Sequence, residues 1–154
     1  MKRAIFPGTF DPFTIGHYSI VMRGLALFDE IIVAVGVNQL KKTLFDVEKR
    51  LEIIRQAFKN EPQVKVMSYD KLTVDLASEL GAHYILRGIR SVSDFEYEHT
   101  IANTNRKLSG VETVILFTES EYSFISSTII RELISFGKDV SEYLPPNVNI
   151  LPHN

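Results

Sequence analysis

Three short stretches of this sequence combine residue types that bind phosphate groups and other anions. The first runs from Gly8 to His17, where a Pro-Gly-Thr-Phe-Asp-Pro turn is followed by Thr-Ile-Gly-His. The His17 ring can donate an N–H to an anion, or carry a charge when protonated, and the glycine before it allows close approach of a ligand. Taken alone, His17 would be interpreted as a helix-start residue satisfied by its own loop. Because His17 follows this turn, we favour the interpretation that it is a site residue.

The second stretch is Arg87-Gly88-Ile89-Arg90, followed by the acidic run from Asp94 to Glu98. Two guanidinium groups flank a glycine, and their planar forks match phosphate or carboxylate oxygens. The alternative is surface salt bridges between these arginines and the acidic residues. That alternative suits Glu96 better than it suits Arg87 and Arg90, which follow a strand.

The third stretch runs from Tyr122 to Arg131 and places three hydroxyl residues, Ser126, Ser127 and Thr128, in a row at a predicted helix start. One hydroxyl is enough to cap a helix. The other two, with the free N–H groups of the first turn, predict an anion site. Plain capping remains the alternative for this stretch when it is taken by itself.

The composition of the chain excludes several kinds of protein. Its 154 residues suit one domain with a sizeable core, and a net charge of −2 gives no general affinity for nucleic acid or membrane. There is no cysteine, which excludes a disulfide framework, a thiolate zinc site and a cysteine nucleophile. The four histidines, at 17, 83, 99 and 153, lack metal-ligand spacing. Any anion site must therefore come from a local cluster of basic residues.

Other motifs and targeting signals are also lacking. The apolar stretch after Lys2 and Arg3 breaks at Pro7, which is too short for a signal peptide or a membrane span, so we expect a cytoplasmic protein. No Walker A and no G-x-G-x-x-G motif is present, which disfavours a P-loop kinase and a Rossmann dehydrogenase. No Ser/His/Asp set with a nucleophile elbow is present either.

Hydrophobic periodicity predicts strands that alternate with helices along the chain. We expect strands over 4–6, 30–37, 64–69, 83–86 and 113–118. We expect helices over 16–28, from a cap at Asp46 to 58, and over 73–80, 93–108 and 127–136, with a last short helix after an Asp139–Glu142 capping box. This order predicts an α/β fold: a Rossmann-like, doubly wound, five-stranded parallel sheet with helices on both faces, in one domain over 1–154. The loops after the first, fourth and fifth strands should then share one crevice.

The three stretches together resemble the nucleotidyltransferase superfamily with T/H-x-G-H and I-S-S-T-x-x-R motifs. Thr14 in place of the first histidine, the Arg-Gly-Ile-Arg stretch and Tyr-Ser-Phe-Ile-Ser-Ser-Thr are similar to the family of bacterial phosphopantetheine adenylyltransferases. The similarity spans nearly the whole chain, including Lys41-Lys42 and the run from Tyr143 to Val148. Each motif is moderately specific alone, and the set in this order is highly specific.

The resemblance implies an activity and a set of partners. ATP and 4′-phosphopantetheine would give 3′-dephospho-CoA and diphosphate in coenzyme A synthesis, with Mg²⁺ as cofactor. From the residues themselves we expect no dedicated carboxylate cage for that ion. The resemblance also implies a homohexamer under feedback by CoA. From the residues themselves we expect no general base, because a phosphate monoester is already largely anionic at pH 7. We expect His17, Lys41, Arg87, Arg90 and the helix start at Ser126 to supply positive potential.

The resemblance also assigns residues. His17 would stabilise the transition state and contact ATP, and Thr9 would touch both the acceptor phosphate and ATP. Phosphopantetheine would be held by Thr9, Lys41, Thr73 and Arg87. The remaining ATP contacts would be Phe10, Gly88, Ile89, Arg90, Glu98, Tyr122, Ser123, Phe124, Ile125, Ser126, Ser127 and Thr128.

Three positions depart from the family pattern, and three other functions are alternatives. Ile15 replaces the commoner asparagine, Thr73 stands where larger apolar side chains are usual, and Tyr122 replaces tryptophan. An adenylyltransferase acting on nicotinamide mononucleotide is the nearest alternative, but those enzymes commonly carry histidine at the position of Thr14. A cytidylyltransferase and a non-catalytic nucleotide-binding module are weaker alternatives.

Overall fold

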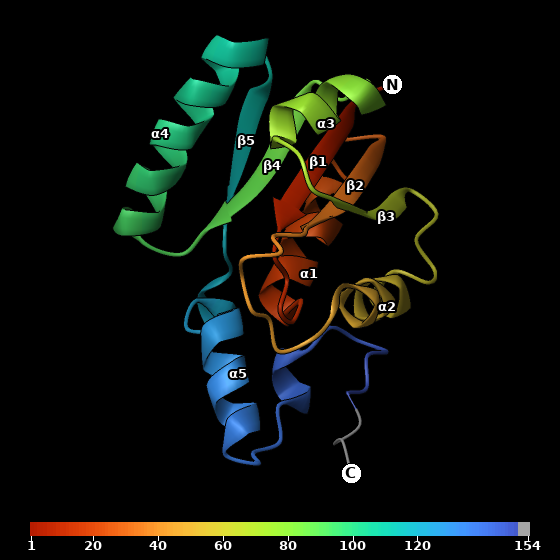
Figure 1. Cartoon of the computed structure of the whole chain (residues 1–154), viewed down its shortest axis with the longest axis vertical. Helices are drawn as coiled ribbons and strands as arrows, with labels where there is room; N and C mark the ends of the chain where they lie inside the picture. Colours follow the sequence, from red (N-terminus) through yellow and green to blue (C-terminus); the bar gives the residue numbers. More distant parts are fainter. Residues whose placement is uncertain (151–154) are drawn as a thin grey trace.

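A computed structural model describes residues 1–150 and contains one parallel sheet of five strands in the order β3-β2-β1-β4-β5 (Figure 1). The strands are β1 (Arg3–Gly8), β2 (Glu30–Gly36), β3 (Val64–Tyr69), β4 (Tyr84–Ile89) and β5 (Glu112–Phe117). All four pairings are parallel. The strand order reverses between β1 and β4, which confirms the predicted doubly wound, Rossmann-like sheet.

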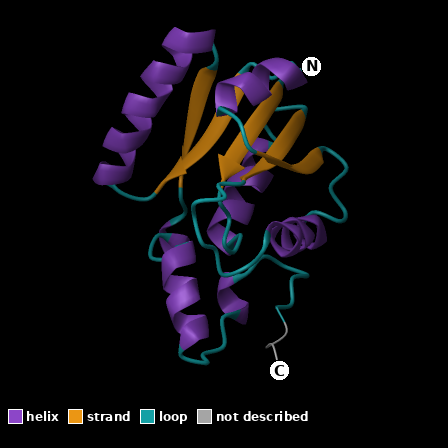
Figure 2. Cartoon of the chain, viewed as in Figure 1, coloured by secondary structure: helices purple, strands orange, loops and turns teal. Residues whose placement is uncertain are grey.

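Helices cover both faces of this sheet, as predicted (Figure 2). They are α1 (Ile15–Gly24), α2 (Val47–Ala57), α3 (Thr73–Leu80), α4 (Val92–Ser109) and α5 (Ser127–Ser135). On one face, alternate strand residues such as Phe6 and Val33 pack with Ile20 of α1 and Ile54 of α2. On the other face Ile5 and Ala34 pack with α3, which contacts α4.

The fifth helix lies beyond the carboxyl ends of the strands rather than on either face (Figure 1). It builds a third apolar cluster around Ile125, Ile130, Val140 and Leu144. Its start therefore faces the edge of the sheet where parallel α/β folds bind ligands. Within residues 1–150, none of the helices is both long and apolar enough to cross a bilayer.

Two strands extend further than the sequence predicts. Pro7 and Gly8 belong to β1 and pair with Ala34 and Val35 of β2, where we had expected a turn. The strand tolerates Pro7 because its pairing with β4 has ended at Ile5, so no ladder partner on that side needs the missing N–H. Similarly, β4 continues through Arg87 to Ile89, since β5 pairs with it along that whole length.

Capping residues fix most of the helix ends as predicted. Asp46 caps α2 by accepting from Lys49 N at 2.8 Å, and Gly81 closes α3 in the left-handed conformation at φ 65°. The first helix ends at Gly24 rather than 28, because the chain must turn to enter β2. The expected capping box at Asp139 is instead a local turn, in which its carboxylate accepts from Ser141 N at 2.9 Å.

Candidate active site

The carboxyl edge of the sheet holds a crevice of about 410 Å³ at the point where the strand order reverses. It is built by the loops after β1, β2, β4 and β5 and by the start of α5, which confirms that the predicted loops share one crevice. Its lining includes Thr9, Phe10, Asp11, Thr14, His17, Lys41, Arg87, Gly88, Arg90, Asp94, Glu98, Thr118, Ile125, Ser126, Ser127, Thr128 and Arg131.

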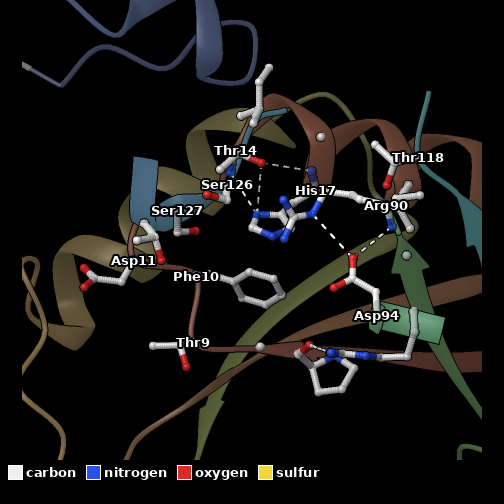
Figure 3. A pocket seen from close by; sticks show the side chains of 18 of the residues that line it. Thr9, Phe10, Asp11, Thr14, His17, Arg90, Asp94, Thr118, Ser126 and Ser127 are labelled. Atoms are coloured by element: carbon white, nitrogen blue, oxygen red, sulfur yellow. Dashed lines mark hydrogen bonds and ion pairs between the residues drawn. The ribbon is translucent and has the colours of Figure 1, made fainter. Parts of the chain in front are cut away.

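His17 lies at the centre of the crevice and is held by the cap of its own helix (Figure 3). Thr14 is the N-cap of α1, and its hydroxyl accepts from His17 N at 3.2 Å. In return, the N–H of Thr14 donates to His17 Nδ1 at 3.0 Å. Because Nδ1 accepts this bond, the ring proton of the neutral imidazole must sit on Nε2. The cap therefore fixes both the tautomer and the orientation of His17.

The surroundings of His17 keep its ring neutral. The rings of Phe10, Phe13 and Phe6 lie 5.0, 5.2 and 6.2 Å from it, centroid to centroid. Burial chiefly, and then the charges of Arg87 and Arg90, lower the pKa of His17 from 6.5 to about 3. His17 therefore offers an Nε2–H donor at pH 7 rather than the positive charge that we had expected.

This pKa predicts how stability depends on pH. Between pH 6.5 and about 3 the unfolded chain binds a proton at His17 that the folded chain does not, so stability is full above pH 6.5 and falls as pH falls. We expect His17→Gln to remove at most about 1.4 kcal/mol per pH unit of this slope. Urea unfolding of both proteins between pH 5 and 7.5 measures it. If the free energy of unfolding changed with pH in the same way in both proteins, the lowered pKa of His17 would be contradicted.

Thr9 and Phe10 form the loop that leaves β1. Phe10 has a positive φ of 54°, and its ring packs so closely on Gly8 that an added Cβ would lie 2.6 Å from it. Glycine is therefore required at position 8 to place Phe10 beside His17. The Thr9 hydroxyl accepts from Lys41 Nζ at 3.4 Å, which joins the loop after β1 to the loop after β2.

Arg87 is anchored by a buried carboxylate. Its Nε and Nη2 donate to the two oxygens of Glu98 at 2.9 and 2.6 Å, and its Nη1 donates to Pro7 O at 2.6 Å. Glu98 is the buried residue of α4, at 5% exposure. The bidentate pair fixes the plane of the guanidinium, which leaves its outer N–H groups for an anion.

Arg90 and Asp94 form a looser pair across the crevice from Thr14 and Ser126 (Figure 3). The Asp94 carboxylate accepts from Arg90 N at 3.0 Å and lies 3.7 Å from Arg90 Nε. Both side chains are partly exposed. The guanidinium of Arg90 is more exposed and less closely paired than that of Arg87, so turning it toward an anion costs less free energy.

The hydroxyls at the start of α5 are all engaged in bonds within the protein. Ser126 caps the helix by accepting from Ile129 N at 3.2 Å, Ser127 donates to Pro12 O at 2.8 Å, and Thr128 accepts from Arg131 at 3.1 Å. The N–H groups of Ser127 and Thr128 have no acceptor among residues 1–150. These N–H groups, more than the hydroxyls, are available to an anion, and the predicted anion site at this helix start stays a prediction.

The crevice gathers most of the predicted residues. Ile89 is buried outside its lining, and Tyr122, Ser123 and Phe124 also lie outside it. Thr73 lines an adjoining cavity of about 240 Å³, together with Thr9, Tyr69, Arg87, Tyr97, Glu98, Ile101 and Asn105. Its hydroxyl lies 2.8 Å from the Tyr69 hydroxyl. The contacts of these residues with ligands stay predictions.

Several residues that shape the crevice were missed by sequence reasoning. Asp11 is buried and accepts from Leu44 N and Phe45 N at 2.8 and 2.9 Å, which ties down the loop that carries Lys41. Asp94, Thr118 and Arg131 also line the crevice. Buried Arg50 binds the Thr9 carbonyl. One signal was available for Arg50, because it follows Val47 by three positions and precedes Ile54 by four, on the apolar face of its helix.

Acidic and histidine side chains do not cluster as metal ligands anywhere within residues 1–150. His153 lies outside the described residues. Within the crevice, the carboxylates of Asp11 and Glu98 are buried against protein groups, whereas that of Asp94, which accepts from Arg90 N, is partly exposed. This donor set suits a cation that arrives on a polyphosphate better than one caged by protein.

The fold and this crevice define a nucleotidyltransferase of the cytidylyltransferase-like family, whose model matches residues 5–133. Among solved structures, the chain resembles a bifunctional NMN adenylyltransferase/ADP ribose pyrophosphatase from Francisella tularensis, with a TM-score of 0.73 at 14% identity. The match covers 95% of this chain and 45% of that longer one, and at this identity it shows the fold alone.

The similarity to curated relatives identifies the family more narrowly than the fold does. The chain is 57% identical to a phosphopantetheine adenylyltransferase of Bacteroides thetaiotaomicron, over 97% of this chain and 99% of that protein. It is 59% identical to that of Phocaeicola vulgatus and 52% identical to that of Flavobacterium psychrophilum, with the same coverage. The chain therefore belongs to the phosphopantetheine adenylyltransferase family, as the motifs had indicated.

Proposed function

We propose that this chain transfers the adenylyl group of ATP to 4′-phosphopantetheine, giving 3′-dephospho-CoA and diphosphate in coenzyme A biosynthesis. The observation that carries the proposal is the neutral Nε2–H of His17, which sits among Lys41, Arg87 and Arg90 in a crevice that adjoins a second cavity. An anion would meet donors and positive potential there, and a longer molecule would find room beside it.

The two cavities suggest how the reactants lie. They share Thr9, Arg87 and Glu98, so the acceptor phosphate would sit between Thr9, Lys41 and Arg87. The arm of phosphopantetheine, which carries amides and a thiol, would follow the second cavity past Thr73 and Asn105. ATP would lie along Arg90 and the free N–H groups of Ser127 and Thr128, where helix dipole and donors favour phosphate.

The reaction needs charge stabilisation and alignment more than proton transfer. An oxygen of the acceptor phosphate attacks the α-phosphorus of ATP, and the bond from that phosphorus to the oxygen bridging to the β-phosphate breaks. One P–O bond forms, one breaks, and diphosphate leaves with its electron pair. No general base is required, because the phosphate is already ionised. His17 Nε2–H would donate to an α-phosphate oxygen as charge develops, and the cations would reduce repulsion between the two anions.

We also propose Mg²⁺ as cofactor. The ion would be held mainly by the phosphate oxygens of ATP, with Asp94 as the crevice carboxylate available toward it. When bound, it neutralises charge on the polyphosphate and so assists departure of diphosphate. The protein side chains supply the remaining positive potential.

Diphosphate release from ATP tests the proposal directly. We expect release with phosphopantetheine and Mg²⁺, none without an acceptor, and none with nicotinamide mononucleotide in place of phosphopantetheine. Addition of EDTA should abolish release, and excess Mg²⁺ should restore it. Turnover with nicotinamide mononucleotide but not with phosphopantetheine would indicate an adenylyltransferase that acts on nicotinamide mononucleotide. ATP binding without turnover on either acceptor would favour a non-catalytic nucleotide-binding module.

The family resemblance also suggests an assembly and a form of regulation for this chain. We propose a cytoplasmic homohexamer, supported by the exposed apolar residues of the edge strand β5 and of α4, among them Phe117, Val92 and Tyr97. Sedimentation velocity would report six times the mass of the chain. CoA carries the same phosphopantetheine arm as the product, so we propose that it competes with phosphopantetheine for this site.

A further inference from the structure

Arg50, in the first turn of α2, is a buried cation whose hydrogen-bond partners within residues 1–150 are all main-chain carbonyls. It is 4% exposed. Its Nε donates to Phe45 O at 3.1 Å, and its Nη1 donates to Thr9 O at 2.9 Å and to Gly36 O at 3.3 Å. A side chain this deeply placed, with these bonds, holds a single orientation.

The three carbonyls belong to three different segments that meet beside the crevice. Thr9 lies in the loop after β1, Gly36 ends β2, and Phe45 ends the loop that carries Lys41. Arg50 therefore ties the backbone of Thr9 to the segment that bears Lys41. The two side chains also meet directly, since Lys41 Nζ donates to the Thr9 hydroxyl at 3.4 Å.

The charge of Arg50 has no counter-charge within the part of the chain that the structure describes. Among residues 1–150, no carboxylate oxygen lies within 4.0 Å of its guanidinium nitrogens. Burying a charge without an ionic partner is destabilising, and hydrogen bonds to neutral carbonyls offset only part of that cost. An anion bound at Thr9 would supply the missing negative charge at short range.

We propose that Arg50 is a positioning residue for the acceptor phosphate. It sets the placement of Thr9 and of the loop carrying Lys41, and its charge adds to the potential at that end of the crevice. This inference rests on the proposed function, because it assigns Thr9 and Lys41 to phosphopantetheine. Within residues 1–150, the bonds of Arg50 reach neither Arg90 nor the start of α5. We therefore expect loss of Arg50 to affect the acceptor phosphate more than ATP, although Thr9 would touch both.

Two substitutions separate the charge of Arg50 from its fork of donors. Arg50→Lys keeps the charge but cannot bind three carbonyls at once, and Arg50→Met removes both. We expect the KM for phosphopantetheine to rise about 10-fold in Arg50→Lys and about 100-fold in Arg50→Met, while the KM for ATP stays within about threefold. Calorimetric Kd values for phosphopantetheine should rise in the same order.

Arg3→Met is the matched control. Arg3 also donates to a main-chain carbonyl, that of Leu80 at 2.7 Å, and pairs with Glu30 at 2.7 Å, but it lies at the opposite edge of the sheet. This variant should lose stability without any change in either KM. All comparisons are made at a temperature where circular dichroism shows each variant folded.

The outcomes are distinct. Equal rises in both KM values, or an unchanged KM for phosphopantetheine in either Arg50 variant, would overturn the positioning role and leave a purely structural arginine. If Arg50→Met does not fold, Arg50→Lys carries the same comparison. Wild-type protein that binds phosphopantetheine without turnover would refute the proposed transfer, while the Kd comparison still decides on Arg50. Wild-type protein that does not bind phosphopantetheine would overturn both proposals.

Discussion

His17→Ala should lower kcat by about 100- to 1,000-fold with little change in the melting temperature or in the KM for ATP. Loss of one preorganised donor to a developing oxyanion typically costs this much. The donor here is Nε2–H, since Nδ1 accepts the N–H of Thr14 at 3.0 Å. Steady-state diphosphate release, with thermal melting beside it, measures the effect.

The control for this variant is His83→Ala, which makes the same change at an exposed position just before β4. It should leave kcat unchanged. A near-normal kcat in His17→Ala would rule out transition-state stabilisation by the imidazole. A rise in the KM for ATP at unchanged kcat would indicate instead that His17 contributes binding that is equal in ground state and transition state.

The second large effect is expected at Arg87. Arg87→Met removes the proposed phosphate donor and leaves the Glu98 carboxylate buried without its partner, which is 2.6 Å away in the structure. We expect the free energy of unfolding to drop by about 3 kcal/mol, and the KM for phosphopantetheine to rise about 100-fold. Urea denaturation and initial-rate kinetics measure the two effects separately.

A double variant distinguishes the two roles of Arg87. Adding Glu98→Gln to Arg87→Met removes the unpaired charge, so stability should largely return while the KM for phosphopantetheine stays high. Recovery of that KM in the double variant would argue against a phosphate contact by Arg87. The single variant Glu98→Gln tests the predicted ATP contact of Glu98, because a role confined to holding Arg87 changes the KM for phosphopantetheine and not that for ATP.

Much of the fold was predictable because its signals are local. Apolar runs with turn residues between them define strands and helices, and caps such as Asp46 and Gly81 need only their own backbone. The extension of β1 through Pro7 was not predictable. It depends on β4 having already diverged from β1, which is a tertiary fact.

Some features of the candidate site were likewise predictable from the sequence, and others depend on the tertiary structure. Sequence alone determined which stretches were candidates for phosphate binding, with Thr9, His17, Arg87, Arg90 and the start of α5, because residue type and order carry that signal. Only the tertiary structure decided that His17 is neutral, that Glu98 is buried against Arg87, and that Arg50 joins Thr9 to the Lys41 loop. These properties arise from burial and from contacts between segments far apart in the chain, which no local pattern encodes.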